Sequence, residues 1–219
     1  MPRKTPLLEG EYYHVFNRGV EKRTIFQDQD DFSRFMLSMT EFNTTSPIGS
    51  IYEHSFQKKP QLGHGVSKLA KSKGMPLVEF VAYCLNKNHF HFILKQVVER
   101  GIEKFMHKLS MGFAKYFNER YKRSGSLFQG PFKSVHIESN EQLLYVGAYV
   151  NLNNLVHGYY KPNQFRSSWH EYTSKIGQGI CNKDIILGQF NDPKIYLKDA
   201  EALAKEIKNR RDLEKLTLE

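Results

Sequence analysis

The segment Asn88-His89-Phe90-His91-Phe92-Ile93-Leu94 combines aromatic and aliphatic residues with two histidines spaced two positions apart, which predicts a β-strand. Side chains two positions apart in a strand point to the same face of a sheet. We therefore expect His89 and His91 side by side on one face, with Phe90 and Phe92 buried on the other. Neutral imidazole is a common metal ligand, so this pair could supply half of a metal site. A half-buried strand that merely carries two histidines is the alternative.

The segments around this strand predict the fold. An apolar strand over 77–85 and the turn residues 86–88 precede it, which indicates an antiparallel hairpin. Hydrophobic spacing and capping residues predict the other elements: a strand over 11–18, a helix over 28–43 capped by Asp30 or Asp31, a helix over 101–121, a strand over 132–137 and a helix from about 141 to 156 ending at Gly158.

The first six elements follow the split βαβ order, which predicts an α+β, ferredoxin-like antiparallel sheet with helices on one face. His89 and His91 would then point to the free face, and the helix from 141 to 156 would cover that face at least in part. We expect a domain over 1–172, with a basic loop insertion at about 44–76 that holds one weak strand or helix at 51–56. The segment 163–179 is expected to be loop, and 173–219 to be a mostly helical extension.

The composition favours a nucleic-acid partner. Lys and Arg total 32 of the 219 residues against 23 for Asp and Glu, a formal charge of +9. The two cysteines indicate no disulfide framework, and no apolar run approaches the ~18 residues that span a bilayer. We therefore expect a cytoplasmic protein that does not enter the membrane. The lysines of the helix over 101–121 could follow a nucleic-acid backbone or form a solvated helix face, and the basic loop leaves the same two interpretations open.

Two residues on the predicted helix from 141 to 156 could complete a site with the histidines. Tyr149 and Asn153 are four positions apart and share one helix face. If that face meets the histidine strand, Asn153 could give an amide oxygen as third metal ligand, and Tyr149 would be a potential nucleophile. Tyr145, one turn earlier, is the rival tyrosine.

Five motifs in this order resemble a known family. The family is that of single-strand DNA transposases with a His-hydrophobic-His (HUH) motif and one catalytic tyrosine, especially the REP-associated tyrosine transposases. The resemblance covers about 11–172 and rests on Tyr13-His14-Val15-Phe16-Asn17-Arg18-Gly19, on 82–91 with Asn88-His89-Phe90-His91, on 124–134 with Ser124-Gly125-Ser126-Leu127-Phe128-Gln129-Gly130, on Tyr149-Val150-Asn151-Leu152-Asn153 and on Phe165-Arg166-Ser167-Ser168.

The resemblance implies a metal-dependent endonuclease and strand transferase that acts on single-stranded DNA, at sites that flank hairpins, through a 5′-phosphotyrosine intermediate. It implies that His89, His91 and Asn153 bind Mg²⁺ or Mn²⁺, that Tyr149 is the nucleophile, and that the protein is a homodimer, associated with the nucleoid of a prokaryote when bound. Polar and basic residues are then candidates for DNA contact: Asn17, Arg18, Lys104, Lys108, Lys115, Arg120, Lys122 and Lys133.

Four positions depart from the family pattern and bear on the DNA sequence preference. Lys87 and Asn154 replace prolines, and Phe128 and Pro131 replace a tryptophan and an arginine. Three alternatives remain open: a replication-initiator or relaxase-type nickase with the same histidine pair, a non-catalytic module of this fold that binds single-stranded nucleic acid, and a structural role for the histidines and tyrosine.

Overall fold

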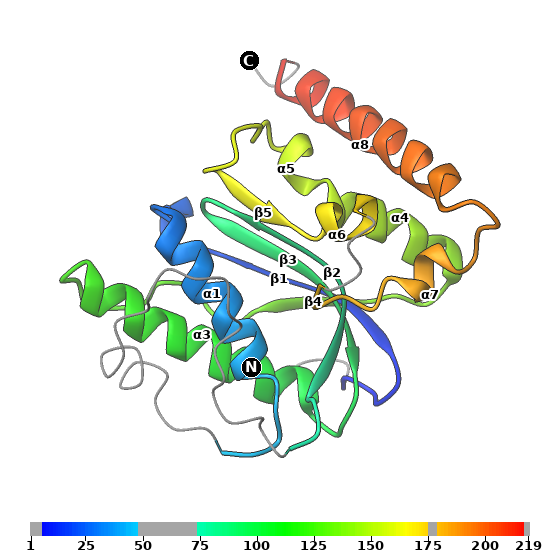
Figure 1. Ribbon diagram of the computed structural model, residues 1–219. Coiled ribbons are helices and arrows are strands. Elements are labelled where there is room, and N and C mark those ends of the chain that lie inside the picture. Colours follow the sequence, from blue (N-terminus) through cyan, green and yellow to red (C-terminus); the bar gives the residue numbers. More distant parts are fainter. Residues whose placement is uncertain (1–5, 48–73, 175–178, 217–219) are drawn as a thin grey trace.

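The computed structural model describes residues 6–47, 74–174 and 179–216, and its centre is an antiparallel sheet with strand order β4-β1-β3-β2-β5 (Figure 1). The chain runs strand, helix, strand, strand, helix, strand through the first four strands, so the predicted α+β, ferredoxin-like class is confirmed. The strands are β1 (Tyr12–Arg18), β2 (Val78–Asn86), β3 (His89–Gln96), β4 (Lys133–His136) and β5 (Phe165–Ser167).

Strand β3 is the middle of the sheet and pairs with β1 on one side and β2 on the other. Successive side chains of β3 point to opposite faces of the sheet, as predicted, and a hydrophobic core lies on each face. Phe90 and Phe92 are fully buried in the first core, whereas Ile93 is buried in the second. His89 and His91 share the face of Ile93, since all three sit at alternate positions.

Helices α1 (Gln29–Glu41) and α3 (Gly101–Arg120) cover the first face of the sheet (Figure 1). Phe35 of α1 packs on Phe90 and Phe92 of β3, and Phe113 of α3 packs on Phe35. The predicted cap of α1 is wrong by two or three positions. Asp28 is the N-cap and accepts hydrogen bonds from the backbone N–H groups of the two residues expected to cap, Asp30 and Asp31.

Helices α4 (Asn140–Asn151) and α5 (Asn153–Val156) cover the second face, and α8 (Pro193–Leu216) packs on these two helices (Figure 1). The expected continuous helix from 141 to 156 is divided at Leu152, whose φ of −112° and ψ of 19° are not helical. Buried residues of α4 and α8 join Val81 and Ile93 of the sheet in the second core, so the expectation that this helix covers the histidine face is confirmed.

The expected loop over 163–179 contains two elements, β5 and α6 (Trp169–Thr173). The prediction failed because β5 has three residues and takes its partners from β2, which is distant in the sequence. The buried Ser168 hydroxyl holds the segment in place, accepting from the Tyr83 backbone N–H at 2.8 Å and donating to Asn151 Oδ1 at 2.6 Å. Two short helices complete the fold, the 3₁₀ helix η1 (Val20–Lys22) and α7 (Asp184–Leu187).

The expected strand or helix at 51–56 lies outside the described residues, but the two ends of the basic insertion meet. The backbone N–H of Thr45 donates to the carbonyl of Met75 at 2.9 Å. The division of the chain at residue 172 stays a prediction. None of the helices in the described part of the chain combines the length and hydropathy needed to cross a lipid bilayer.

Arg120, one of the candidate DNA contacts, is an internal ion-pair partner at the end of α3. Its guanidinium contacts Asp28 at 2.7 Å and the fully buried Asp31 at 3.0 Å. The Asp31 carboxylate also accepts hydrogen bonds from the hydroxyls of Tyr116 at 3.1 Å and Tyr121 at 2.8 Å. Arg120 thus ties α3 to the start of α1.

We expect Arg120→Met to lower the free energy of unfolding by about 3 kcal/mol, because it leaves the buried Asp31 carboxylate without its cation. The matched control is Arg210→Met, which removes an exposed pair with Glu206 and should change stability by less than about 0.5 kcal/mol. Denaturant unfolding of both variants measures the difference. Equal stability losses would contradict the structural role of Arg120.

Candidate active site

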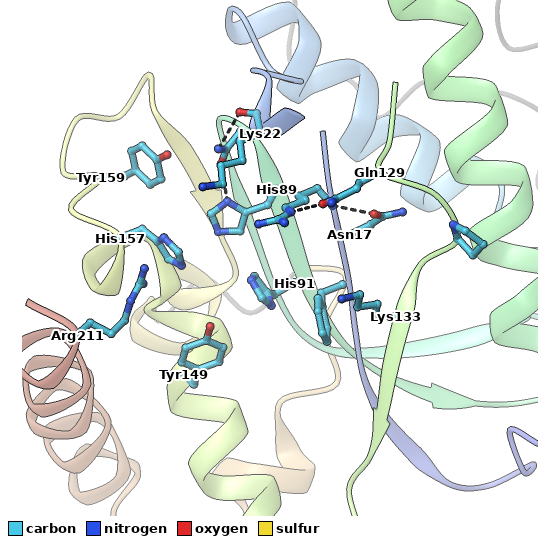
Figure 2. A pocket seen from close by; sticks show the side chains of 14 residues that line it. Asn17, Lys22, His89, His91, Gln129, Lys133, Tyr149, His157, Tyr159 and Arg211 are labelled. Carbon is cyan, nitrogen blue, oxygen red and sulfur yellow. Dashed lines mark hydrogen bonds between the residues drawn. The ribbon is translucent and has the colours of Figure 1, made fainter. Parts of the chain in front are cut away.

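A pocket of about 600 Å³ opens on the second face of the sheet, at the histidine end of β3 (Figure 2). β1, β3, the turn before β4, the α4–α5 region and the end of α8 all contribute side chains to it. The lining residues are Phe16, Asn17, Arg18, Lys22, Asn88, His89, His91, Gln129, Pro131, Lys133, Tyr149, His157, Tyr159 and Arg211.

His89 presents its Nε2 lone pair to Asn153. The amide oxygen of Asn88 lies 2.6 Å from His89 Nδ1 and accepts its proton, so Nε2 is the unprotonated nitrogen. His89 Nε2 lies 3.1 Å from Asn153 Oδ1. Asn86 Nδ2 lies 3.0 Å from His89 Nε2 and 2.8 Å from Asn153 Oδ1. His89 Nε2 and Asn153 Oδ1 are therefore two acceptors that face the same point, and the Asn86 amide group donates hydrogen bonds to both.

His91 is paired with a histidine of the neighbouring strand. Its Nδ1 lies 2.8 Å from Nε2 of His14, and the two rings stack with centroids 5.1 Å apart. When Nδ1 of His91 carries the proton, it donates to His14 and leaves the His91 Nε2 lone pair available. This second contact fixes the orientation of the ring, as the outer partner of a metal-binding histidine does.

Burial keeps these rings neutral. It lowers the pKa of His14 and of His89 from 6.5 to about 4. The pKa of His91 is also held well below 6.5, mainly by burial and then by the neighbouring rings of His14 and His89. Near pH 7 the imidazoles are therefore unprotonated bases, which is the form that binds metal ions.

The donor set fits a divalent cation. Two ligands at the 2.0–2.1 Å of an octahedral Mg²⁺ site, at right angles, lie about 3 Å apart, close to the 3.1 Å between His89 Nε2 and Asn153 Oδ1. The Nδ2 atom of Asn153 is buried and has no hydrogen-bond partner among the described residues. The described residues contain no group of three or more His, Cys, Asp or Glu placed to hold a metal, so here an amide would supply the third donor.

Tyr149 lies beside the histidines. Its ring centroid is 5.6 Å from that of His91 and 6.0 Å from that of His14, with both rings edge-on. Burial raises the pKa of the Tyr149 hydroxyl, and the Asn153 side chain and then the positive charge of Arg211 partly oppose that rise. The rival Tyr145 is 46% exposed and does not line the pocket. The structure therefore brings Tyr149, His89, His91 and Asn153 together and leaves Tyr145 outside.

The candidate DNA contacts divide into two groups. Asn17, Arg18 and Lys133 line the pocket, and the Arg18 guanidinium donates to the side chain of Gln129 (Figure 2). The others lie on or just after α3, which covers the opposite face of the sheet: Lys104, Lys108, Lys115, Arg120 and Lys122. Lys104 and Lys108 donate to backbone carbonyls of Glu99 and Thr44, and Arg120 pairs with aspartates, so these three have partners within the protein.

Sequence reasoning missed four cationic or imidazole side chains near the site: Lys22 of η1, His14, His157 and Arg211. The alternation along β1 is the signal for His14, because it places His14 on the face opposite the strand's buried residues, and β1 pairs with β3. Tyr149, Asn153 and His157 follow one another at intervals of four positions, and this spacing could have indicated His157. Its ring centroid is 4.4 Å from that of His89. Arg211 comes from α8 and had no signal in a charged helix.

The comparisons with known proteins agree with the resemblance noted in the sequence. Residues 51–153 match the model of a family described as "Transposase IS200 like". This segment is similar to the IS200-like transposases, which confirms the resemblance. The comparison with curated proteins found no match.

A solved structure is similar in fold. It is described as "Structure of the REP associates tyrosine transposase bound to a REP hairpin". The match has a TM-score of 0.51 and 13% sequence identity, and it covers 82% of this chain and 89% of the other. At this identity the likeness establishes the α+β fold.

We expect the stability of the metal-free protein to fall as the pH is lowered from 6.5 towards 4. In that range the unfolded chain binds protons that the buried His14 and His89 do not, because their pKa is about 4 when folded. Each ring accounts for a loss of up to about 3 kcal/mol in the free energy of unfolding, because one pKa unit corresponds to about 1.4 kcal/mol.

Denaturant unfolding in a chelating buffer at pH 7 and pH 4.5 tests this expectation. His89→Gln should lose less stability between the two pH values than the unmodified protein, whereas His107→Gln, at an exposed position of α3, should behave as the unmodified protein does. An unchanged pH dependence in His89→Gln would contradict the expectation.

Proposed function

We propose that this chain cleaves and rejoins single-stranded DNA through a covalent bond between Tyr149 and a 5′-phosphate. The observation that carries the proposal is the meeting of Tyr149 with the imidazole pair in one pocket, with ring centroids of Tyr149 and His91 5.6 Å apart. The match of residues 51–153 to IS200-like transposases supports this reaction class. A non-catalytic binding module would need none of these groups together.

The reaction is a transesterification. The Tyr149 oxygen attacks the phosphorus and loses its proton, a Tyr–O–P bond forms, and the bond between phosphorus and the 3′-oxygen breaks. The leaving oxygen takes up a proton and becomes a free 3′-OH. The new bond is again a phosphodiester, so another 3′-OH can attack it, release Tyr149 and join two strands without ATP.

His89, His91 and Asn153 would hold the metal ion. When bound, a divalent cation would offset the negative charge that develops on the phosphate oxygens. Imidazole ligands bind transition metals more strongly than Mg²⁺, so of the two expected ions this donor set favours Mn²⁺. Asn88 and His14 orient the rings of His89 and His91 through their hydrogen bonds at 2.6 and 2.8 Å.

The pocket suits a flexible single strand, since the attacking tyrosine lines it beside the buried rings of His89 and His91. Arg18 and Lys133 line the same pocket and are candidates for contact with the DNA backbone. The similar solved structure holds a REP hairpin, so a hairpin next to the cleavage site is the substrate to test first. One chain supplies all four groups of the site, which supports cleavage within a subunit; the homodimer stays an expectation.

We expect Tyr149→Phe to abolish the covalent adduct with a single-stranded hairpin substrate in Mn²⁺ and to leave DNA binding within about threefold, because only the reacting oxygen is removed. Denaturing gel electrophoresis of labelled DNA measures the adduct. Tyr145→Phe, one turn earlier and exposed, is the control and should form the adduct normally. Adduct formation by Tyr149→Phe, with its loss in Tyr145→Phe, would assign the nucleophile to Tyr145.

His91→Ala is expected to weaken Mn²⁺ binding at least tenfold and to remove metal-dependent cleavage, because it deletes one of the proposed ligands. Calorimetric titration of Mn²⁺ into the protein reads the binding without DNA. His107→Ala, on α3, serves as the control. Unchanged Mn²⁺ affinity in His91→Ala would exclude this metal site even if cleavage were lost.

A further inference from the structure

Helix α8 carries an arginine in line with its buried residues. Tyr196, Ala200, Ala204 and Ile207 are all 9% exposed or less, and they follow one another at spacings of four, four and three. Arg211 comes four positions later and so continues the same face. An amphipathic helix that served only to cover the core would place another apolar residue there.

Arg211 reaches the pocket that holds Tyr149. Its side chain lines that pocket together with His157, and Figure 2 shows it extending from α8 towards His157, on the side of the pocket where Tyr149 lies. Its Nη1 donates to the carbonyl oxygen of Val156, the last residue of α5, at 3.3 Å. This contact joins α8 to the helical segment that follows the tyrosine.

Arg211 is a cation without a carboxylate partner in the described part of the chain. Its neighbours on α8 differ, because Lys208 pairs with Asp212 and Arg210 pairs with Glu206, both at 2.7 Å. Among the residues that the structure describes, no acidic side chain lines the pocket. A half-buried guanidinium in a pocket lined by imidazoles is suited to an anion, and its planar array of donors matches the oxygens of a phosphate.

We propose that Arg211 contacts the scissile phosphate, so that the C-terminal helix completes the active site. This inference rests on the proposed function. The guanidinium would donate to a non-bridging phosphate oxygen and stabilise the charge that grows there as Tyr149 attacks. Arg211 lies outside the matched segment 51–153, so the site extends beyond the region that the family model describes.

The experiment compares single-turnover adduct formation, with a hairpin substrate in Mn²⁺, for three variants of the full chain. Arg211→Met keeps an apolar stem and removes the charge; we expect the rate to fall by about 100- to 1,000-fold, the range for loss of one charge-stabilising donor. Arg211→Lys restores a charge and should recover part of the rate. Arg210→Met, the exposed neighbour, should match the unmodified protein.

A second substrate separates contact with the phosphate from a purely structural role. A methylphosphonate at the scissile position replaces a charged oxygen with a methyl group. If Arg211 acts on that oxygen, the difference between the unmodified protein and Arg211→Met should shrink at least fivefold on this substrate. A rate loss of the same size on both substrates, or no recovery in Arg211→Lys, would show that Arg211 only holds α8 in place.

The outcomes distinguish this inference from the proposed function. If the unmodified protein and Arg210→Met form no adduct, the proposed function fails. If they form it and Arg211→Met does so at the same rate, the inference about Arg211 alone is wrong. Should Arg211→Met fail to fold, Arg211→Lys is measured on the two substrates instead. A normal rate on both substrates would support a role for the charge. A rate loss that is equal on both substrates would refute contact with the phosphate.

Discussion

The two-sided character of β3 is the constraint on which the rest of the structure depends. The strand is hydrogen-bonded along both edges, to β1 and to β2, so its backbone is fixed in the middle of the sheet. Phe90 and Phe92 anchor one side against α1 and α3, each contributing roughly 1.5–3 kcal/mol by burial. A shift of one residue in register would exchange the phenylalanines with His89 and His91, so burial of the rings also fixes the direction of the imidazoles.

Burying the imidazoles is costly unless each ring has a partner, and the structure supplies these partners. Asn88 and Asn86 contact His89, and His14 contacts His91. The rings are held neutral and oriented before any ligand arrives. Such preorganisation is valuable in a site that must stabilise developing charge, because little reorganisation is needed during the reaction.

The second core packs the tyrosine helix and the C-terminal helix together as one unit. α4 rests on the sheet, α8 rests on α4 and α5, and their buried residues form one cluster with Val81 and Ile93 (Figure 1). The break at Leu152 lets Asn153 approach His89 while Tyr149 stays beside His91. The position of Tyr149 therefore depends on helices that come from two distant parts of the chain.

The sequence alone determined the order of the first elements, the face to which each residue of β3 points, and the residue types of the site. These follow from local periodicity, which each segment carries by itself. It did not separate Tyr149 from Tyr145, because both occupy one helix face at a spacing of four. The structure separated them, since only the sheet contact shows which turn of α4 lies over the histidines.

Tertiary structure alone also decided the roles of the arginines and of β5. Arg120 and Arg211 both sit in charged helices and look alike in the sequence, yet one closes an internal carboxylate cluster and the other enters the pocket. Strand β5 is too short to have a period and exists because β2 offers it a free edge. Local pattern specifies which face of an element is buried, whereas the partner of a charge depends on segments that meet after folding.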